Sequence, residues 1–120
     1  MYPTLADLAG LPVAENLEGT SFKPLLDNPH LPWKTAAFSQ YPRTHRGQHL
    51  MQYTMRTNRY RFTRWVHRDD HSKIDAVELH DHKLDSVENV NIASKPENAE
   101  LVDRSTRQLL AGWQATPLTF

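Results

Sequence analysis

The stretch from Met51 to Val66 alternates apolar or aromatic side chains with polar ones on two arms that are separated by a short turn. A period of two is what a strand with one buried face requires, so the stretch predicts two neighbouring antiparallel strands. We place the turn at Thr57-Asn58, because asparagine tolerates the left-handed backbone that short hairpin turns need. The repeating positions are Met51, Tyr53 and Met55 on the first arm and Tyr60, Phe62 and Val66 on the second.

Several other segments carry strand or helix signals. Short helices are expected at residues 2–10, which end at Gly10, and at Phe22–Leu26. Ser94 and Glu97 form a capping-box pattern that predicts a long C-terminal helix. We expect strands at Ala36–Tyr41, where Pro42 ends the strand, at 50–56, at 59–67 and at Ile74–His80. The apolar stripe of the long helix consists of Ala99, Val102, Thr106, Leu109, Leu110 and Trp113, with Gly112 and Pro117 ending the helix.

Strands followed by a helix favour an α+β fold over a parallel α/β sheet. The expected architecture is a three- to four-stranded antiparallel sheet packed by one C-terminal helix, with an N-terminal helix and loop arm. We divide the chain into the arm, residues 1–34, and the sheet with its helix, residues 35–120. Only 38% of the 120 residues are hydrophobic, below the roughly 45–50% (glycine included) that is usual in globular domains. The composition fits either a polar, loop-rich domain or a domain whose remaining apolar face packs on a partner.

Composition also excludes several classes of function. The 14 acidic and 14 basic residues balance, so no global field steers the chain to nucleic acid or to an anionic membrane. The absence of cysteine excludes disulfides, thiolate catalysis and cysteine-ligated zinc. No apolar run approaches the roughly 20 residues of a membrane span, and no secretory signal follows Met1. We therefore expect neither nucleic acid nor a membrane as a partner.

Six blocks of the chain, taken in order, resemble the C-terminal part of type I sulfatases, especially those similar to iduronate-2-sulfatase. The ordered set covers nearly the whole chain, although each block alone is mostly hydrophobic packing. The S-Q-Y-P-R segment followed by the hairpin favours the iduronate-2-sulfatase-like branch over generic arylsulfatases. The blocks are Y-P-T-L-A-D-L-A-G-L-P from Tyr2, L-E-G-T-S-F-K-P-L-L from Leu17, W-K-T-A-A-F-S-Q-Y-P-R from Trp33, the hairpin Met51–Val66, E-L-H-D-H-K-L-D-S-V-E-N-V-N from Glu78, and the helix from Pro96.

The chain departs from the family pattern at two positions in the block from Glu78. His80 stands where the family usually has tyrosine, and Ser86 stands where the following turn usually has proline. We expect His80 to be a surface residue. Neither change alters the expected fold.

The resemblance implies that the chain is a C-terminal subdomain and that residues 1–34 lie at the seam with a large catalytic domain, the expected partner. It also implies calcium and a formylglycine, made from Cys or Ser in a C/S-x-P-x-R motif, both in that missing domain. Ser39–Arg43 is not this motif, because Pro42 follows the serine by three residues instead of two. We therefore expect no catalytic residue, no metal and no sulfatase activity in this chain alone. With this resemblance, the low apolar fraction is better explained by a domain whose apolar face packs on a partner than by a polar, loop-rich domain.

The resemblance further implies sulfated sugars as substrates of the intact enzyme, in an exported, periplasmic or lysosomal setting. Arginine suits bidentate binding of sulfate and carboxylate, and an aromatic face suits a sugar ring. The alternative for each such residue is a purely structural role. The candidates for lining the substrate cleft are Gln40, Tyr41 and Arg43 on the S-Q-Y-P-R segment and Trp65 and His67 at a strand end.

Two other ligands are weighed against structural explanations. His80 and His82 alternate on one strand, but this H-x-H pair supplies two ligands where zinc needs three or four, so we expect solvated histidines. Arginines interleaved with aromatic residues suggest a nucleic-acid platform. The lack of a basic footprint favours arginines on the face opposite the aromatic core, paired with Asp69, Asp70 or Glu78. The cluster of Asp85, Glu88 and Asn89 is expected to cap backbone groups in a turn.

The alternative function is a non-enzymatic interaction module, derived from a sulfatase by truncation, that associates with itself. Such a homo-oligomer would bury the apolar seam of the arm, which consists of Leu5, Leu8, Leu11, Phe22 and Leu25.

Overall fold

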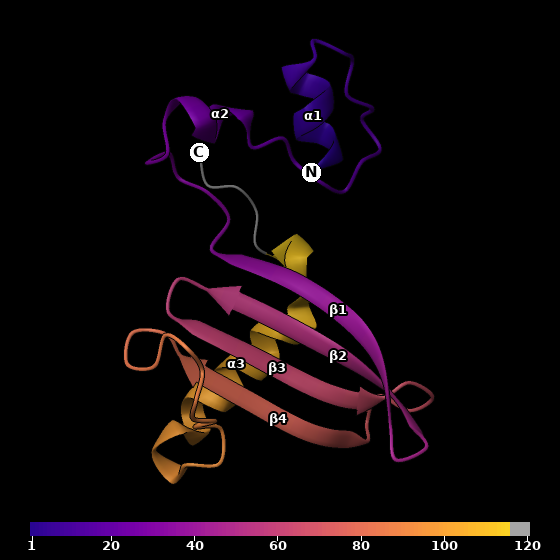
Figure 1. The fold of residues 1–120 in the computed structure, drawn as a ribbon, viewed down its shortest axis with the longest axis vertical. Helices are drawn as coiled ribbons and strands as arrows, with labels where there is room; N and C mark the ends of the chain where they lie inside the picture. The colour runs from indigo at the N-terminus through magenta and orange to yellow at the C-terminus, as the bar shows by residue number, and fades with distance from the viewer. Residues whose placement is uncertain (116–120) are drawn as a thin grey trace. The chain divides into compact units, whose positions relative to one another are not determined.

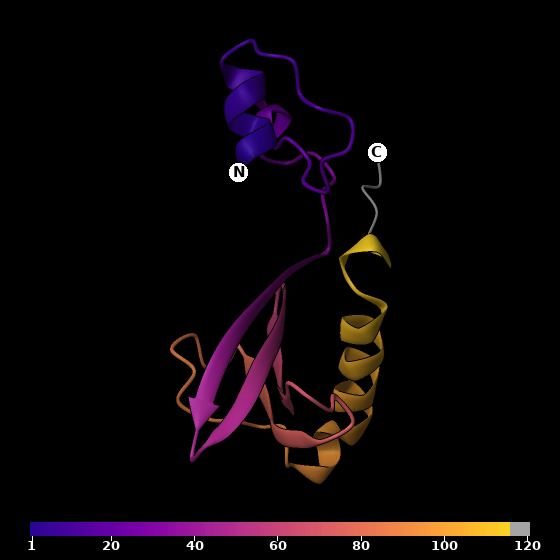
Figure 2. The same ribbon diagram turned by 90° about the vertical axis from the view of Figure 1, so that its right-hand side faces the viewer.

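The computed structural model describes residues 1–115, which divide into two compact units, Met1–Trp33 and residues 34–115. The second unit is a four-stranded antiparallel sheet in the order β1-β2-β3-β4 (Figure 1). Helix α3 (Ala99–Ala111) covers one face of this sheet and leaves the other face open (Figure 2). The predicted α+β fold is therefore confirmed. The strands are β1 (Ala36–His45), β2 (Gln48–Thr57), β3 (Tyr60–His67) and β4 (Ile74–Asp81).

The hydrophobic core lies between the sheet and α3. Strand pairing aligns Phe38, Met55, Phe62 and Leu79 in one row across all four strands. Phe62 and Leu79 are fully buried. Partly buried residues of α3, among them Leu101, Val102 and Leu109, pack against this row. The alternation that the sequence showed in Met51–Val66 thus forms the core as predicted.

Strand β1 is longer than predicted, because Pro42 does not end it. Pro42 pairs with Met51 in the middle of the β1–β2 ladder, and β1 continues to His45. The prediction that Pro42 stops the strand is wrong because β1 is an edge strand. Proline is tolerated there, since the N–H that it lacks would point away from the ladder.

The left-handed turn lies in the β1–β2 hairpin and not at Asn58. The two residues between β1 and β2, Arg46 and Gly47, have φ of 49° and 76°. Positive φ at both central positions is the type I′ geometry that matches the twist of the paired strands. Asn58 and Arg59 connect β2 to β3, and neither has positive φ. Instead, the Thr57 side chain closes that turn by accepting a hydrogen bond from the Tyr60 N–H at 3.0 Å.

The C-terminal helix is confirmed, but its start and its buried stripe differ from the predictions. A 3-10 turn, η1 (Pro96–Asn98), precedes α3, and Lys95 occupies the N-cap of that turn without a side-chain hydrogen bond. The predicted capping box therefore does not form, because Ser94 lies one residue outside the helical turn. A second 3-10 turn, η2 (Trp113–Ala115), follows α3; Pro117 lies outside the described residues.

The stripe of α3 that faces the sheet is rotated from the predicted one. Ser105 is buried and Leu101 is half-buried, whereas Ala99 is exposed and Leu110 is 71% exposed. Val102 and Leu109 do pack on the core as predicted. The buried face of α3 is the one whose side chains fit the surface of the sheet, and it differs from the face that carries the most apolar residues.

The segment after β4 protects the free edge of the sheet. The Asn91 side chain donates to the Val77 carbonyl and accepts from the Leu79 N–H, both at 3.0 Å. The Ile92 N–H then donates to the Leu79 carbonyl at 2.9 Å. These bonds pair backbone groups that an exposed edge strand would leave open to other chains.

The first unit contains helices α1 (Tyr2–Leu8) and α2 (Lys23–Asp27). Gly10 ends α1 in a left-handed conformation, with φ of 68°, as predicted. The Gly10 N–H donates to Asp7 and the Leu11 N–H to Ala6, the hydrogen-bond pattern of a Schellman cap. Thr4, which is 1% exposed, accepts from the Phe22 N–H at 3.1 Å and joins the two helices.

The apolar seam predicted for the arm is partly exposed. Leu5, Leu8 and Leu11 are 58%, 52% and 60% exposed, while Phe22 and Leu25 are half-buried within the unit. Among residues 1–115, no helix has the length and apolar character that crossing a membrane requires.

Candidate functional site

Four of the five predicted substrate residues lie on the face of the sheet that α3 leaves uncovered, which we call the open face. Pairing aligns Tyr41 with Gln52 and Trp65, and it aligns Arg43 with Leu50 and His67. Neighbouring residues of a strand point to opposite faces, so Gln40 lies on the helix side. There Gln40 pairs with Tyr53 and lines a hollow together with Leu109. The structure therefore separates Gln40 from the other four.

Arg43 and Trp65 contact each other at one end of the open face. The guanidinium carbon of Arg43 lies 5.2 Å from the centroid of the Trp65 ring, a cation–π contact. The Trp65 indole N–H donates to a Glu78 carboxylate oxygen at 3.0 Å, which fixes the orientation of the ring. Because Arg43 covers the Trp65 ring, the more accessible aromatic surface is that of Tyr41, which is 65% exposed. This surface has the chemistry to bind an anionic sugar.

Sequence reasoning missed three residues of this surface. Glu78 orients Trp65, Gln52 lies between Tyr41 and Trp65, and His45 Nδ1 lies 3.5 Å from the Arg43 guanidinium. Alternation along a strand predicts the face on which two of them lie, because His45 is two residues beyond Arg43 and Gln52 is two residues beyond Leu50. Which residues are neighbours across strands depends on the strand register, which the sequence of one segment does not give.

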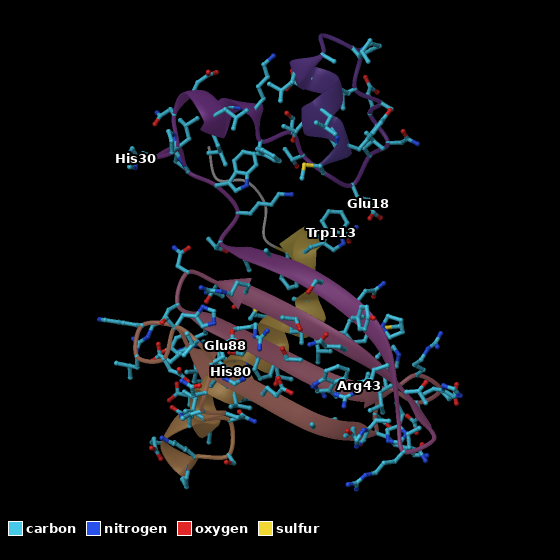
Figure 3. All side chains as sticks on the ribbon, viewed as in Figure 1. Glu18, His30, Arg43, His80, Glu88 and Trp113 are labelled. Carbon is cyan, nitrogen blue, oxygen red and sulfur yellow. The ribbon has the colours of Figure 1, made fainter. Side chains whose placement is uncertain are left out.

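A second cluster lies at the other end of the open face, where Figure 3 shows His80 and Glu88 close together and apart from Arg43. The Glu88 carboxylate contacts both Arg61 and His82. His80 is 7% exposed, and its Nε2 lies 3.9 Å from a Glu78 carboxylate oxygen. The prediction of solvated histidines is wrong for His80, because the sheet and the segment with Glu88 enclose it.

The arginines of the hairpin do not pair with Asp69, Asp70 or Glu78, and that prediction is wrong. Arg59 binds Asp81 through two hydrogen bonds of 2.9 and 2.7 Å, and Arg61 binds Glu88. The Arg59 guanidinium holds the pKa of the Asp81 carboxyl below its ordinary value. Arg64 also departs from the prediction, because it pairs with Tyr53 on the helix side of the sheet.

The predicted turn chemistry holds for Asp85 but not for Glu88. Asp85 accepts from the Val90 N–H at 2.8 Å and from the Asn89 side chain at 3.4 Å. Hydrogen bonds from the Val90 N–H first, and then from the Asn89 backbone N–H, lower the pKa of Asp85. Glu88, with φ of 60°, instead directs its carboxylate to Arg61 and His82.

The residues present do not fit the calcium and formylglycine centre that type I sulfatases use. The chain has no cysteine, and its one serine-proline-arginine segment has the wrong spacing. Among residues 1–115, no three His, Asp or Glu side chains gather in a way that would hold a metal ion. The open face carries cationic and aromatic side chains, among them Arg43, Tyr41 and Trp65.

The four-stranded sheet and its covering helix are the fold of the C-terminal subdomain of sulfatases, as the family match and the solved structures show. The family model described as N-sulphoglucosamine sulphohydrolase, C-terminal, matches residues 1–114, and the chain belongs to this family. The chain is 32% identical over 104 residues to N-acetylglucosamine-6-O-sulfatase from Bacteroides thetaiotaomicron, a match that covers 82% of this chain and 17% of the relative.

Solved structures give the same fold. A candidate sulfatase from Bacteroides thetaiotaomicron superposes with a TM-score of 0.74 and 23% identity, covering 95% of this chain and 24% of that chain. BT4656, solved in complex with its substrate D-glucosamine-2-N,6-O-disulfate, superposes with a TM-score of 0.61 and 28% identity, covering 92% and 24%. The chain therefore spans about a quarter of these structures and less of the curated relative.

Proposed function

We propose that the chain is the C-terminal subdomain of a sulfatase that hydrolyses sulfuric esters of sugars. The observation that carries this proposal is the family match across residues 1–114, which includes both units. The names of the relatives support a sugar substrate, since one is an N-acetylglucosamine-6-O-sulfatase and another binds a disulfated glucosamine. In this proposal the catalytic domain, with its calcium and formylglycine, is the partner of the chain, and the enzyme acts in an exported, periplasmic or lysosomal compartment.

Within the intact enzyme, we assign the open face to one wall of the substrate cleft. Arg43 supplies a cation for sulfate or carboxylate, and Tyr41 supplies an exposed aromatic surface for a sugar ring. His67 shares a row with Arg43 through Leu50. Glu78 positions Trp65, and Trp65 in turn positions Arg43. Gln40 lies on the helix side and belongs to this wall only if the cleft extends around the β1 edge.

Two sugar classes compete for the finer assignment. The S-Q-Y-P-R segment and the hairpin favour a 2-sulfated iduronate, whereas the curated relative favours a 6-sulfated glucosamine. The ratio of kcat/KM for these two substrates, measured on the full-length sulfatase that carries this chain, decides between the two branches.

The cleft assignment is tested by Arg43→Ala in that full-length sulfatase. Loss of a charge-assisted contact to a bound anion should raise KM about tenfold, with a smaller change in kcat. Arg104→Ala, which removes an exposed charge from α3, is the matched control and should leave KM unchanged. An unchanged KM in Arg43→Ala would remove Arg43 from the substrate site.

The exposure of Leu5, Leu8 and Leu11 favours a second candidate, a self-associating module. Sedimentation of the 120-residue chain separates the candidates. A stable oligomer that the Leu5→Glu substitution dissociates into monomers supports self-association. A monomer at all concentrations supports the other candidate, in which a second domain covers these leucines.

A further inference from the structure

A cavity on the helix side of the sheet, apart from the open face, is built from three elements and one loop. Its volume is about 210 Å³. Strands β2 and β3, the β3–β4 loop and α3 all contribute to its walls. The lining residues are Tyr53, Arg64, Val66, His71, Leu109 and Leu110.

Arg64 is the unusual member of this lining. It is half-buried on the face of the sheet that forms the apolar core, between Tyr53 of β2 and Val77 of β4. Among the described residues, its guanidinium has no hydrogen bond, ion pair or ring contact, whereas Arg59 and Arg61 of the same hairpin both bind carboxylates. A guanidinium stays charged at any ordinary pH, and Arg64 is half-buried beside apolar walls with no carboxylate to balance its charge. An anion in the cavity would supply the missing partner.

The remaining walls determine what kind of anion fits. Val66 is 3% exposed, and Leu109 and Leu110 of α3 also line the cavity. The Tyr53 and His71 rings meet edge to face, with centroids 5.5 Å apart, and present aromatic surface. Apolar walls of this kind leave the hydroxyl groups of a sugar without partners. With roughly 30 Å³ per water molecule, the space equals that of about seven waters, which suits a ligand with a single ring.

We propose that this cavity binds a small organic carboxylate with an apolar body, whose head group pairs with Arg64 and whose body packs between the ring pair and α3. The site lies on the opposite face of the sheet from Arg43, so it does not rest on the proposed function. Leu110, which is 71% exposed, borders the entrance to the cavity.

The test is a titration of the 120-residue chain with sodium benzoate, followed by amide and arginine side-chain NMR signals. We expect saturable shifts at the amides of Tyr53, Val66 and Leu110 and at the Arg64 side chain. Benzamide, which has the same shape without the charge, should bind at least about tenfold more weakly, the effect of one charge-assisted hydrogen-bonded pair.

Arg64→Gln should weaken benzoate binding by a similar factor, and Arg68→Gln, an exposed arginine outside the cavity, should leave it unchanged. If Arg64→Gln fails to fold, Arg64→Lys and the comparison of benzoate with benzamide on the unmodified chain still decide the question. Equal binding of benzoate and benzamide, shifts confined to Arg43 and Trp65, or no saturable shift would overturn the proposal.

Discussion

Asp81 ties the turn between β2 and β3 to the end of β4. Its carboxylate accepts two hydrogen bonds from Arg59, of 2.9 and 2.7 Å, and a third from the Lys83 N–H at 3.0 Å. The residue is 6% exposed. A nearly buried carboxylate with three donors is a structural anchor, and this explains the D within the E-L-H-D-H segment without a catalytic role.

Replacing Asp81 with asparagine should lower the free energy of unfolding by about 2 kcal/mol, because hydrogen bonds to a charged group are lost and Arg59 loses its partner. Asp75→Asn, at an exposed position of β4, is the control and should change stability by less than about 0.5 kcal/mol. Urea unfolding followed by circular dichroism measures both. Equal effects of the two substitutions would contradict the anchor role.

The pH dependence of stability follows from Asp81 together with two other aspartates. Asp70, Asp81 and Asp85 have pKa values lowered by hydrogen bonds, from Ser72, Arg59 and the Val90 N–H first in each case. A lowered pKa in the folded state contributes stability that is fully present above the unfolded value of about 3.9 and is lost as the pH falls below it. The urea midpoint should therefore be flat near neutral pH and fall below pH 4. Asp81→Asn should show a shallower fall, and an unchanged slope would rule out Asp81 as a contributor.

At the scale of elements, the β1–β2 hairpin controls the position of Arg43. Its turn has positive φ at Arg46 and at Gly47, so the register of Arg43 opposite Leu50 depends on a backbone that glycine adopts most easily. The cation–π contact with Trp65 then sets the direction of the Arg43 side chain. The geometry of the open face thus depends on the Arg46-Gly47 turn that follows β1.

Gly47→Ala should cost about 1–2 kcal/mol of stability, because a side chain is forced into the left-handed region. Asn58→Ala should cost much less, since Asn58 lies in the other turn without positive φ. Thermal or urea unfolding of the two variants compares the turns directly. A larger loss for Asn58→Ala would show that the β2–β3 turn is the left-handed one.

Much of this fold follows from local patterns, and the errors have specific causes. Alternation placed Met55 and Phe62 in the core, and a terminal glycine placed the end of α1. The prediction for Pro42 failed because strand order, which decides whether a strand is an edge, is not local. His80 was predicted to be exposed for a similar reason, since the segment with Glu88, eight residues further along the chain, folds back beside it.

The placement of the candidate residues on the sheet, though not their role, follows in part from the sequence. Four of its residues fall on one face because their parity in β1 and β3 is consistent, and the fifth, Gln40, has the opposite parity. Glu78 was expected to pair with an arginine, and it binds Trp65 instead. Such partners depend on the register between strands, which no single segment of sequence determines.

At the scale of the whole molecule, the chain belongs to a sulfatase family but spans 17% of its curated relative. It has a well-packed sheet and helix, an arm with exposed leucines, and an open face with exposed Tyr41 beside the Arg43–Trp65 pair. In our account the chain contributes structure and one wall of the cleft, and the catalytic domain contributes the chemistry.

The most direct measurement is the release of sulfate from D-glucosamine-2-N,6-O-disulfate, with calcium present, by the purified 120-residue chain and by the full-length sulfatase that carries it. We expect release by the full-length protein on this or another sulfated sugar, and no release above buffer by the chain alone. Saturable release by the chain alone, in proportion to its concentration, would contradict the claim that its chemistry resides in another domain.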